Sequence, residues 1–435
     1  QPVTDTNNSM RAAQITRMNN NRWAVVLGNG YNSANQRPVL LIQYLGADPK
    51  GNAAGDKALL RIPTTGTVEV PPETGKGLAN DNGLSAPRLV DLNGDGRVDI
   101  AYAGDNQGNL WKFDLLSTDD AQWKVAFDGS PLFTAKGGTQ GSPDSRTLAQ
   151  PITIAPTVRA NDRYATVGTG NDAVSMRVGG MMVAFGTGRN VTKTDENNRN
   201  VQTLYSVLDN TRYRINSSSK RLEIHPGGGT CSPTPKPNCV PVPKALGEGV
   251  ATAGLEPRTI EAAGKEGQGR ILAANDIDWE EQNGWYLDYP ETGERQLKPI
   301  EFYDGSNLMT VYSQVPAKGS DAQEGVESCE SGSVDEERQY RTLINIMDGK
   351  RPSVQIVDAN GDGLFTEDDG GISRVPVSKG SHIMITSTSV GSGGGSGGGS
   401  DSDDCKNMDI DVKNNKENLA CLPEQSLRPS WRQVK

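Results

Sequence analysis

Short apolar runs separated by polar turns fill the chain from residue 22 to residue 357. Runs of this kind, bounded by Gly, Asn and Asp, are typical of thin β-strands in sandwiches, barrels and propellers. No helical stripe of comparable length competes with them. We therefore predict an all-β fold. The clearest runs are 22–30, 37–46, 97–105, 108–115, 179–188, 202–209, 284–290, 308–316 and 339–349.

A weak internal repeat favours a propeller among these all-β folds. An apolar strand ending in Gly-x-Gly recurs as VVLGNG (25–30), ATVGTG (165–170) and VAFGTG (183–188). A fixed strand-and-turn unit that recurs along a chain is typical of repeat architectures. The alternative is that these glycines simply end strands, as they do in many β-proteins. A nucleotide-binding loop is not expected, because no convincing helix follows any of the three.

Composition agrees with a turn-rich protein that binds cations. The 435 residues include 51 Gly and 25 Pro, which interrupt long helices and form turns. The 44 Lys and Arg against 54 Asp and Glu give a net charge of -10, which disfavours nucleic acid as a partner. No apolar run approaches the roughly 20 residues that cross a bilayer, so we predict no direct membrane insertion. A chain that begins at Gln1 is expected to be a mature or truncated piece.

The five cysteines favour disulfides over a metal site. No CxxC pair occurs, and two histidines are too few for the usual zinc sites. Cys231 with Cys239 and Cys405 with Cys421 would each close a short loop, which suits an oxidising compartment. Cys329 is then left over: it is free, it is exchanged into one of these pairs, or its partner lies in a segment that this chain lacks.

Composition also predicts where the domain ends. The segment GSGGGSGGGS (391–400) is a flexible linker by composition, either natural or engineered. We predict a propeller-like domain over 1–390, a Gly/Ser-rich linker over 391–404 and a tail over 405–435 that packs back on the propeller. Trp431 is a candidate anchor for that tail. The polar stretch 190–268 is expected to contain surface insertions.

The clearest chemical signal is the segment VDLNGDGRVDIAYAGD at 90–105. A tightly curled loop can aim its alternating side-chain oxygens at one point, while two glycines permit the turn and a backbone carbonyl completes the ring. Ca²⁺ is the favoured ion, because it accepts about six to eight oxygen ligands in flexible geometry whereas Mg²⁺ requires a stricter octahedron. The predicted ligands are Asp91, Asn93, Asp95, Asp99 and the backbone of Arg97.

This first loop departs from a helical EF-hand. The twelfth position of an EF-hand loop carries a bidentate acid, and here it is Tyr102. We therefore expect a calcium loop between two β-strands, with water or a neighbouring group as a further ligand. An ion-free turn is the alternative, although three carboxylates held this closely would repel one another without a cation.

A second segment, VDANGDGLFTEDDGG at 357–371, repeats the scheme. Its ninth position is Thr366 and its twelfth is an Asp, which is closer to the EF-hand pattern with Asp in place of the final Glu. We predict a second calcium site, with an ion-free turn again as the alternative. The predicted ligands are Asp358, Asn360, Asp362, Leu364 through its carbonyl, and Asp369.

Candidate catalytic groups are scarce, and we predict that the chain is not an enzyme. His225 lies among polar residues, and His382 sits in the apolar segment SHIMITS. No HExxH motif, nucleophile elbow or Cys/His pairing occurs. The acidic run 276–281 could serve glycoside hydrolysis if two of its carboxylates were correctly spaced, but a solvated loop is the simpler interpretation. Five tryptophans are expected to pack between strands and not to serve as sugar platforms: Trp23, Trp111, Trp123, Trp279 and Trp285.

These residues together resemble the PilC/PilY family of type IV pilus biogenesis proteins and tip adhesins. The matching elements follow the family order: RWAVVLGNGYNS (22–33), the loop with GNLWKFDL (90–115), 152–189, LYSVLD (204–209), NGWYLDYPETGER (283–295), VDANGDG (357–363) and the terminal SWRQVK. The resemblance implies a modified β-propeller with long loop insertions. It also implies calcium ligation by the first loop, through the five residues named above.

The resemblance further implies a role and a location. A member of this family would be extracellular, at the pilus tip, on the bacterial cell surface or at the outer membrane. It would bind minor pilins, support pilus assembly or oppose retraction, support twitching motility, and adhere to a host-cell receptor or glycan. We expect calcium to neutralise the clustered carboxylates and to order a loop beside a binding surface.

Two rivals from other classes remain open. One is a secreted calcium-dependent glycan-binding module without a pilus role. The other is a quinone-dependent dehydrogenase, which also combines a propeller with calcium. Such an enzyme needs a calcium-bound cofactor in the central funnel, whereas the ligands predicted here occupy contiguous loops that satisfy the ion by themselves.

Overall fold

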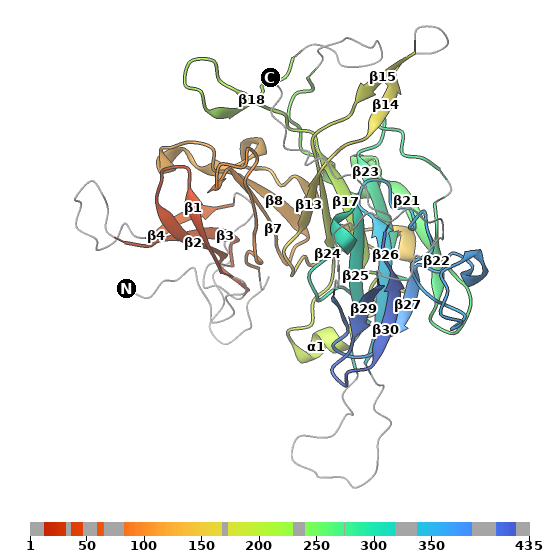
Figure 1. Ribbon diagram of the computed structural model, residues 1–435. Coiled ribbons are helices and arrows are strands. Elements are labelled where there is room, and N and C mark those ends of the chain that lie inside the picture. Colours follow the sequence, from red (N-terminus) through yellow and green to blue (C-terminus); the bar gives the residue numbers. More distant parts are fainter. Residues whose placement is uncertain are drawn as a thin grey trace, which may run out of the picture.

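The computed structural model describes nine stretches of the chain, and the fold is built from them. They are residues 13–31, 36–46, 59–64, 82–167, 173–228, 240–273, 275–317, 337–384 and 406–422. Nearly all of the regular structure in these stretches is β-strand, so the prediction of an all-β fold is confirmed. Figure 1 shows a smaller sheet assembly, coloured red to orange, beside a larger one coloured yellow to blue.

The first sheet has five strands in the order β4-β3-β2-β1-β6. Neighbouring strands are antiparallel except for β1 and β6, which are parallel. Because successive side chains of a strand point to opposite faces, every second residue of β2 and β3 faces the core, as Val26 and Ile42 do. The strands are β1 (Gln14–Met18), β2 (Trp23–Gly28), β3 (Val39–Tyr44), β4 (Leu59–Pro63) and β6 (Arg97–Val98).

The second sheet lies between two hydrophobic cores. One face, with Trp111 and Phe113, packs against the first sheet, and the opposite face, with Tyr102, packs against the larger assembly. All five residues of β7 are therefore buried. The order is β20-β10-β8-β7-β5, with β9 on β8. The strands are β5 (Arg88–Val90), β7 (Ile100–Gly104), β8 (Asn109–Asp114), β9 (Lys124–Val125), β10 (Phe133–Thr134) and β20 (Gly247–Glu248).

The third sheet has ten strands and curls until its two edges approach each other. Thr157 of the edge strand β13 donates its hydroxyl to the carbonyl oxygen of Ile300 (2.9 Å), directly before the other edge strand, β24. Arg159 of β13 lies over the ring of Phe302 in β24. The strands in order are β13 (Thr157–Ala160), β16 (Met181–Gly186), β17 (Thr203–Asp209), β23 (Gly284–Asp288), β21 (Glu256–Ala262), β22 (Gly269–Leu272), β27 (Arg374–Val377), β26 (Arg338–Asn345), β25 (Leu308–Val315) and β24 (Glu301–Phe302).

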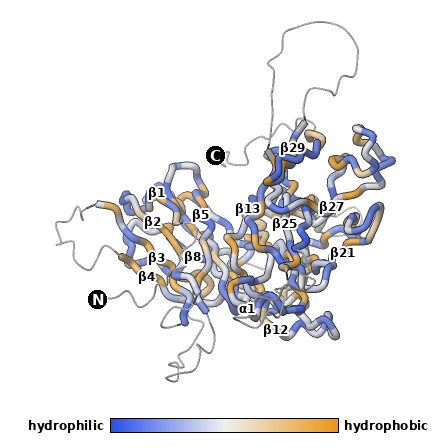
Figure 2. Tube along the Cα trace, turned by 90° about the horizontal axis from the view of Figure 1, so that it is seen from below, coloured by the Kyte–Doolittle hydropathy of each residue, from blue (hydrophilic) through white to orange (hydrophobic). Residues whose placement is uncertain are grey.

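Short hairpins and turns complete the fold. The β14–β15 and β18–β19 hairpins project from the larger assembly in Figure 1. Figure 2 shows hydrophobic positions along the sheets of both assemblies. The helices α1 (Lys193–Glu196) and α2 (Gly249–Ala253), like every helix in the described ranges, fall short of what a membrane span requires. The small strands are β11 (Lys136–Gly137), β12 (Leu148–Ala149), β14 (Tyr164–Val167), β15 (Val174–Arg177), β18 (Tyr213–Ile215), β19 (Leu222–Ile224), β28 (His382–Met384), β29 (Lys406–Ile410) and β30 (Lys416–Ala420).

The β29–β30 hairpin lies on the third sheet. Leu419 forms a β-bridge with Val357, and the buried Arg341 of β26 pairs with Asp409 and with Glu417 (2.9 Å). Segment 391–405 and Trp431 lie outside the described residues. The boundaries 1–390, 391–404 and 405–435 therefore stay predictions.

Among the described strands, three end in a joint of the same design. At each joint, the polar residue that follows a glycine bonds twice to the first residue of the next strand. Its backbone N–H donates to that residue's carbonyl oxygen, and its side-chain oxygen accepts that residue's N–H. The pairs are Asn29 with Val39 (3.1 and 3.0 Å), Asp105 with Asn109 (3.1 and 2.9 Å) and Thr187 with Thr203 (3.0 and 2.8 Å).

The joints explain two of the three Gly-x-Gly motifs. Segments 25–30 and 183–188 supply two joints, so these two copies form a repeat of structure. The third joint, Gly-Asp-Asn at 104–106, does not match the Gly-x-Gly motif because Asn106 stands in place of the second glycine. A Cβ on Gly28 would meet the backbone oxygens of Leu84 and Ser85, so close backbone approach excludes a side chain there. Gly168 and Gly170 lie outside the described residues.

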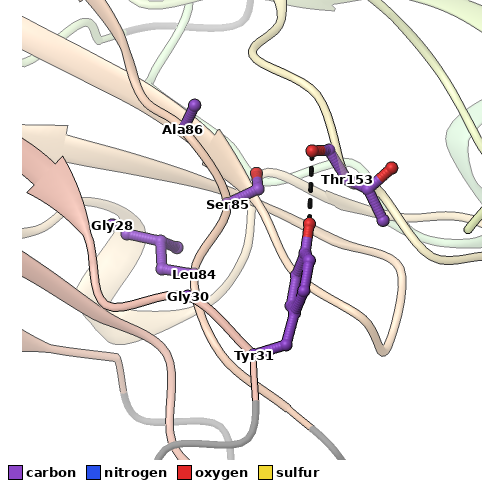
Figure 3. Close-up of a pocket in the computed structure, with 7 residues that line it drawn as sticks. All are labelled: Gly28, Gly30, Tyr31, Leu84, Ser85, Ala86 and Thr153. Atoms are coloured by element: carbon purple, nitrogen blue, oxygen red, sulfur yellow. Dashed lines mark hydrogen bonds between the residues drawn. The ribbon is translucent and has the colours of Figure 1, made fainter. Parts of the chain in front are cut away.

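A small pocket lies beside the first joint (Figure 3). The hydroxyl of Tyr31 donates to the carbonyl oxygen of Thr153 across it (3.2 Å). The lining carries no charged side chain. The lining residues are Gly28, Gly30, Tyr31, Leu84, Ser85, Ala86 and Thr153.

A buried ion pair joins the second sheet to the third. Nζ of Lys112 in β8 lies 2.5 Å from Oδ2 of Asp209 in β17, and each side chain is 1% exposed. Asp209 also accepts the hydroxyls of Tyr102 and Thr211, both at 2.6 Å. Burial alone would raise the pKa of Asp209, but the ammonium of Lys112 and these hydroxyls lower that pKa below its usual value. The carboxylate is therefore ionised in the folded protein.

We expect Lys112→Met to lower the free energy of unfolding by about 3–5 kcal/mol, because it leaves the Asp209 carboxylate buried without a counter-charge. Denaturant unfolding of the whole chain measures the loss. Lys124→Met is the matched control, because Lys124 in β9 is exposed. Equal stability of the two variants would contradict this role of the pair.

Candidate metal centre

The first predicted calcium loop, residues 91–99, connects β5 to β7 at the edge of the second sheet. The N–H of Asp99 donates to the carbonyl oxygen of Val90 (2.9 Å) and so closes the base of the loop. Gly94 and Gly96 have φ of 75° and 81°, in the left-handed region that disfavours other residues. A Cβ at either position would meet nothing within 4 Å, so backbone conformation and not space requires these glycines.

The polar side chains in the first half of this loop are oriented by backbone N–H groups further along it. Each of these side chains accepts at least one N–H from a residue two to five positions ahead. These bonds curl the loop around its own polar side chains, the local arrangement from which a calcium loop is built. The bonds are Asp91 with Gly94 and Gly96 (both 2.7 Å), Asn93 with Asp95 (3.0 Å) and Asp95 with Arg97 (3.0 Å).

Asp99 is the buried member of the predicted ligand set, with 1% of its surface exposed. One carboxylate oxygen accepts the N–H of Leu92 (2.8 Å), and the other accepts the side-chain amide of Asn19 (2.9 Å). Burial raises the pKa of Asp99 to about 6, and the charges of Asp91 and Asp95 act in the same direction. A cation in this loop would relieve that accumulation of negative charge.

The second predicted loop, residues 358–369, has the same internal bonds. Its glycines Gly361 and Gly363 have φ of 87° and 82°. The loop follows Val357, whose β-bridge to Leu419 fixes its start on the C-terminal hairpin. The bonds are Asp358 with Gly361 (2.7 Å) and Gly363 (2.8 Å), Asn360 with Asp362 (2.8 Å) and Asp362 with Leu364 (2.8 Å).

The final acid of each loop has the same contact although the loops differ in length. Asp369 accepts the N–H of Ala359 (2.8 Å), the second residue of its loop, as Asp99 accepts that of Leu92. The longer loop reaches this arrangement through a turn at 367–369, in which Asp369 also accepts the N–H of Thr366 (2.9 Å). The twelfth residue of the second loop therefore corresponds to the ninth residue of the first.

The donor sets of both loops suit calcium. Each combines three carboxylates, one amide oxygen and a backbone carbonyl, which are the hard oxygen ligands that Ca²⁺ prefers. Within the described stretches, however, no three Asp, Glu, His or Cys side chains already converge as a metal cluster. The residues fit the ion in type and order, and calcium binding itself stays a prediction.

The other candidates from the sequence have ordinary structural contacts. Nδ1 of His225 accepts the N–H of Gly227 (3.0 Å), and Nδ1 of His382 lies 3.3 Å from the carbonyl oxygen of Gly380. In the acidic run 276–281, Asp276 forms an ion pair with a lysine of the third sheet's loops. None of these groups is placed beside a described pocket.

The structure tests the packing prediction for the tryptophans but not the predicted cysteine pairings. Trp111, Trp123 and Trp285 are buried between strands as expected, whereas Trp23 is 55% exposed, so the packing prediction is wrong for that residue. Cys421 is disulfide-bonded. The other four cysteines lie outside the described residues, so the pairings Cys231–Cys239 and Cys405–Cys421 stay predictions.

The sequence pattern did not indicate the structural role of the buried carboxylate of Asp105. Asp105 is fully buried and accepts the N–H of Gln107, the N–H and side-chain amide of Asn109, and the indole N–H of Trp111. Burial raises its pKa, and these hydrogen bonds oppose the rise. The motif GDNQGNLW is thus a structural corner built around Asp105. The signal was present in the sequence, but it resembles an ordinary Asp-containing turn.

Comparison with known proteins identifies the class of the fold as a β-propeller. A family model described as the PilY1 beta-propeller domain matches residues 4–229, more than half of the 435-residue chain. The chain belongs to the PilY1 family. The resemblance found in the sequence and the modified β-propeller that it implied are both confirmed.

This chain and each relative align over only part of their lengths. The type IV pilus biogenesis factor PilY1 of Pseudomonas aeruginosa is 32% identical over 305 residues, which are 64% of this chain and 21% of that protein. A PilY1 homolog of Xylella fastidiosa is 32% identical over 206 residues, 46% of this chain and 12% of its own length. The chain thus spans about a fifth or less of these relatives.

A solved structure is similar in fold. The crystal structure of the Pseudomonas aeruginosa PilY1 C-terminal domain aligns with a TM-score of 0.58 and 20% identity. The alignment covers 97% of this chain and 74% of that one. At this identity the likeness supports the fold alone.

We expect Asp95→Ala to remove calcium binding at the first loop, because the substitution deletes both a ligand and the acceptor of the Arg97 N–H. Calorimetric titration of calcium, with thermal unfolding in its presence and absence, measures the change. Glu280→Gln, which removes an exposed acid away from both loops, is the control. Equal affinity and equal thermal stabilisation in Asp95→Ala and the unsubstituted protein would reject the first loop as a site.

The second loop is expected to bind independently. Asp362→Ala should lower the calcium stoichiometry by one while the first loop still titrates, because no ligand is shared between the loops. Asp368→Asn is the matched control, since Asp368 lies in the same segment outside the predicted ligand set. An unchanged stoichiometry in Asp362→Ala would exclude this loop.

Proposed function

We propose that this chain is the propeller part of a type IV pilus biogenesis factor that acts by calcium-dependent binding of other proteins and not by catalysis. The observation that carries the proposal is the family match together with two loops of identical internal bonding, each ending in a buried acid. The first loop begins directly after Val90, the last residue of β5, and the second after Val357, which forms an isolated β-bridge with Leu419 of β30. Each loop is therefore anchored at its start to a strand.

Calcium would be held in the first loop by Asp91, Asn93, Asp95, Asp99 and the carbonyl oxygen of Arg97. In the second loop, the corresponding set is Asp358, Asn360, Asp362, Asp369 and the carbonyl oxygen of Leu364. The bound ion supplies positive charge that neutralises clustered carboxylates. The N–H groups of the loop orient the ligand side chains before the ion binds. This reduces the entropy that the loop loses when calcium binds.

The partners proposed for this surface are minor pilins at the pilus tip and a host-cell receptor or glycan. The factor would support pilus assembly or oppose retraction and thereby support twitching motility and adhesion. Its location would be extracellular, at the pilus tip, on the bacterial cell surface or at the outer membrane. The names of the Pseudomonas and Xylella relatives support the pilus role.

A binding role is also supported by what surrounds the charged groups. In the described ranges, a ring nitrogen of each histidine lies within hydrogen-bonding distance of its own turn, and the buried acids Asp105, Asp209 and Glu294 are each held by several donors or by a buried cation. Groups that are fully satisfied in this way hold a fold together and are poorly placed to transfer protons.

The proposal is tested by co-purifying this chain with the minor pilins of the same bacterium, once with calcium and once with a chelator. We expect association in calcium and at least a tenfold loss with the chelator. The double variant Asp95→Ala with Asp362→Ala should fail to associate even in calcium, whereas Glu280→Gln should behave as the unsubstituted chain. No association under any condition, together with binding on a glycan array, would favour the secreted glycan-binding module instead.

A further inference from the structure

Asn19 connects the first calcium loop to a different sheet. It lies in the turn between β1 and β2 and is 7% exposed. Its side-chain nitrogen lies 2.9 Å from Oδ1 of Asp99, 3.0 Å from the carbonyl oxygen of Val98 and 3.1 Å from that of Leu115. An amide nitrogen carries two hydrogens, so these acceptors share them. One side chain from the first sheet's turn therefore holds the C-terminal end of the loop and the residue that follows β8.

A second contact joins the same two parts. The strand β6 contains Arg97, the predicted carbonyl ligand, and pairs in parallel with β1. The register places Arg97 beside Arg17 and Val98 beside Met18. The last three residues of the loop are thus held by the first sheet along their backbone and through Asp99.

The second loop has no such dependence. In the stretches that the structure describes, the donors to the carboxylate of Asp369 are the N–H groups of Ala359, Asn360 and Thr366, all from its own loop. The two loops therefore share their internal bonding and differ in whether another sheet orients the final acid. This difference provides an internal control within one molecule.

We propose that Asn19 is a positioning residue of the first calcium loop, and that calcium binding there fastens the first sheet, β1 to β4, to the second. The inference rests on the proposed calcium binding. The amide holds the Asp99 carboxylate in the orientation in which it can serve as a ligand. Because coupling between two sites is reciprocal, an Asn19 contact that strengthens calcium binding requires that calcium strengthen the contact.

The first experiment measures calcium affinity by calorimetry in the Asp362→Ala background, where only the first loop binds. Adding Asn19→Ala should weaken that site about 10- to 100-fold, the usual effect of losing a residue that orients a metal ligand. In the background Asp95→Ala, where only the second loop binds, Asn19→Ala should leave the affinity unchanged.

Asn20→Ala is the matched control. Asn20 is the next residue and is also an asparagine, but its side-chain amide donates to the hydroxyl of Tyr44 (2.8 Å) and to Asp120 (3.2 Å) and not to the loop. It should change neither affinity. Equal affinities of the Asn19→Ala and Asn20→Ala variants at the first loop would overturn the inference.

The second experiment uses the unsubstituted chain and does not depend on a variant that folds. Hydrogen exchange of the amides in β1 and β2 (residues 14–28) should slow when calcium is added, whereas exchange in β25 and β26 should not change. Calcium binding without slower exchange in β1 and β2 would overturn the inference and leave the proposed function standing. Absence of any calcium binding would overturn both.

Discussion

The buried ion pair between Lys112 and Asp209 is the contact on which the layered arrangement depends. It joins the sheet that carries the first predicted calcium loop to the ten-stranded sheet, and both side chains are almost completely buried. Hydrophobic burial on both sides of the second sheet supplies attraction but little direction. A charged pair with fixed partners is directional, so it sets the position of β8 relative to β17. Tyr102 and Thr211 complete the hydrogen bonding of Asp209 and keep the pair from being a source of strain.

The recurring joint explains why so many short strands form an ordered structure. Asn29, Asp105 and Thr187 each bond twice to the first residue of the next strand, which fixes the register of a strand pair at its start. A one-residue slip would turn a strand's apolar residues to the wrong face. Each joint follows a glycine, because backbone or side-chain atoms of a neighbouring segment occupy the space where a Cβ would lie.

The two predicted calcium loops use this scaffold in different ways. Both obtain the orientation of their oxygens from their own N–H groups, so their internal geometry is local. The final acid of the second loop is also held locally, whereas Asp99 of the first loop is held by Asn19 from another sheet. The first loop is thus the one whose state depends on how two sheets are packed. That dependence is a physical basis for coupling an ion to the arrangement of a larger surface.

The sequence by itself determined the class of fold and the family, and it predicts the ligand residues of both loops. These features are local: alternating apolar residues report strands, and Asp, Asn and Gly at fixed spacing report a curled turn whose hydrogen bonds join residues two to five positions apart. The tertiary structure alone decided which sheets meet, that Asp105 is a buried corner, that Trp23 is exposed, and that Asn19 contacts Asp99 across 80 positions of sequence. Such contacts depend on packing between distant segments, and spacing along one chain carries no record of it.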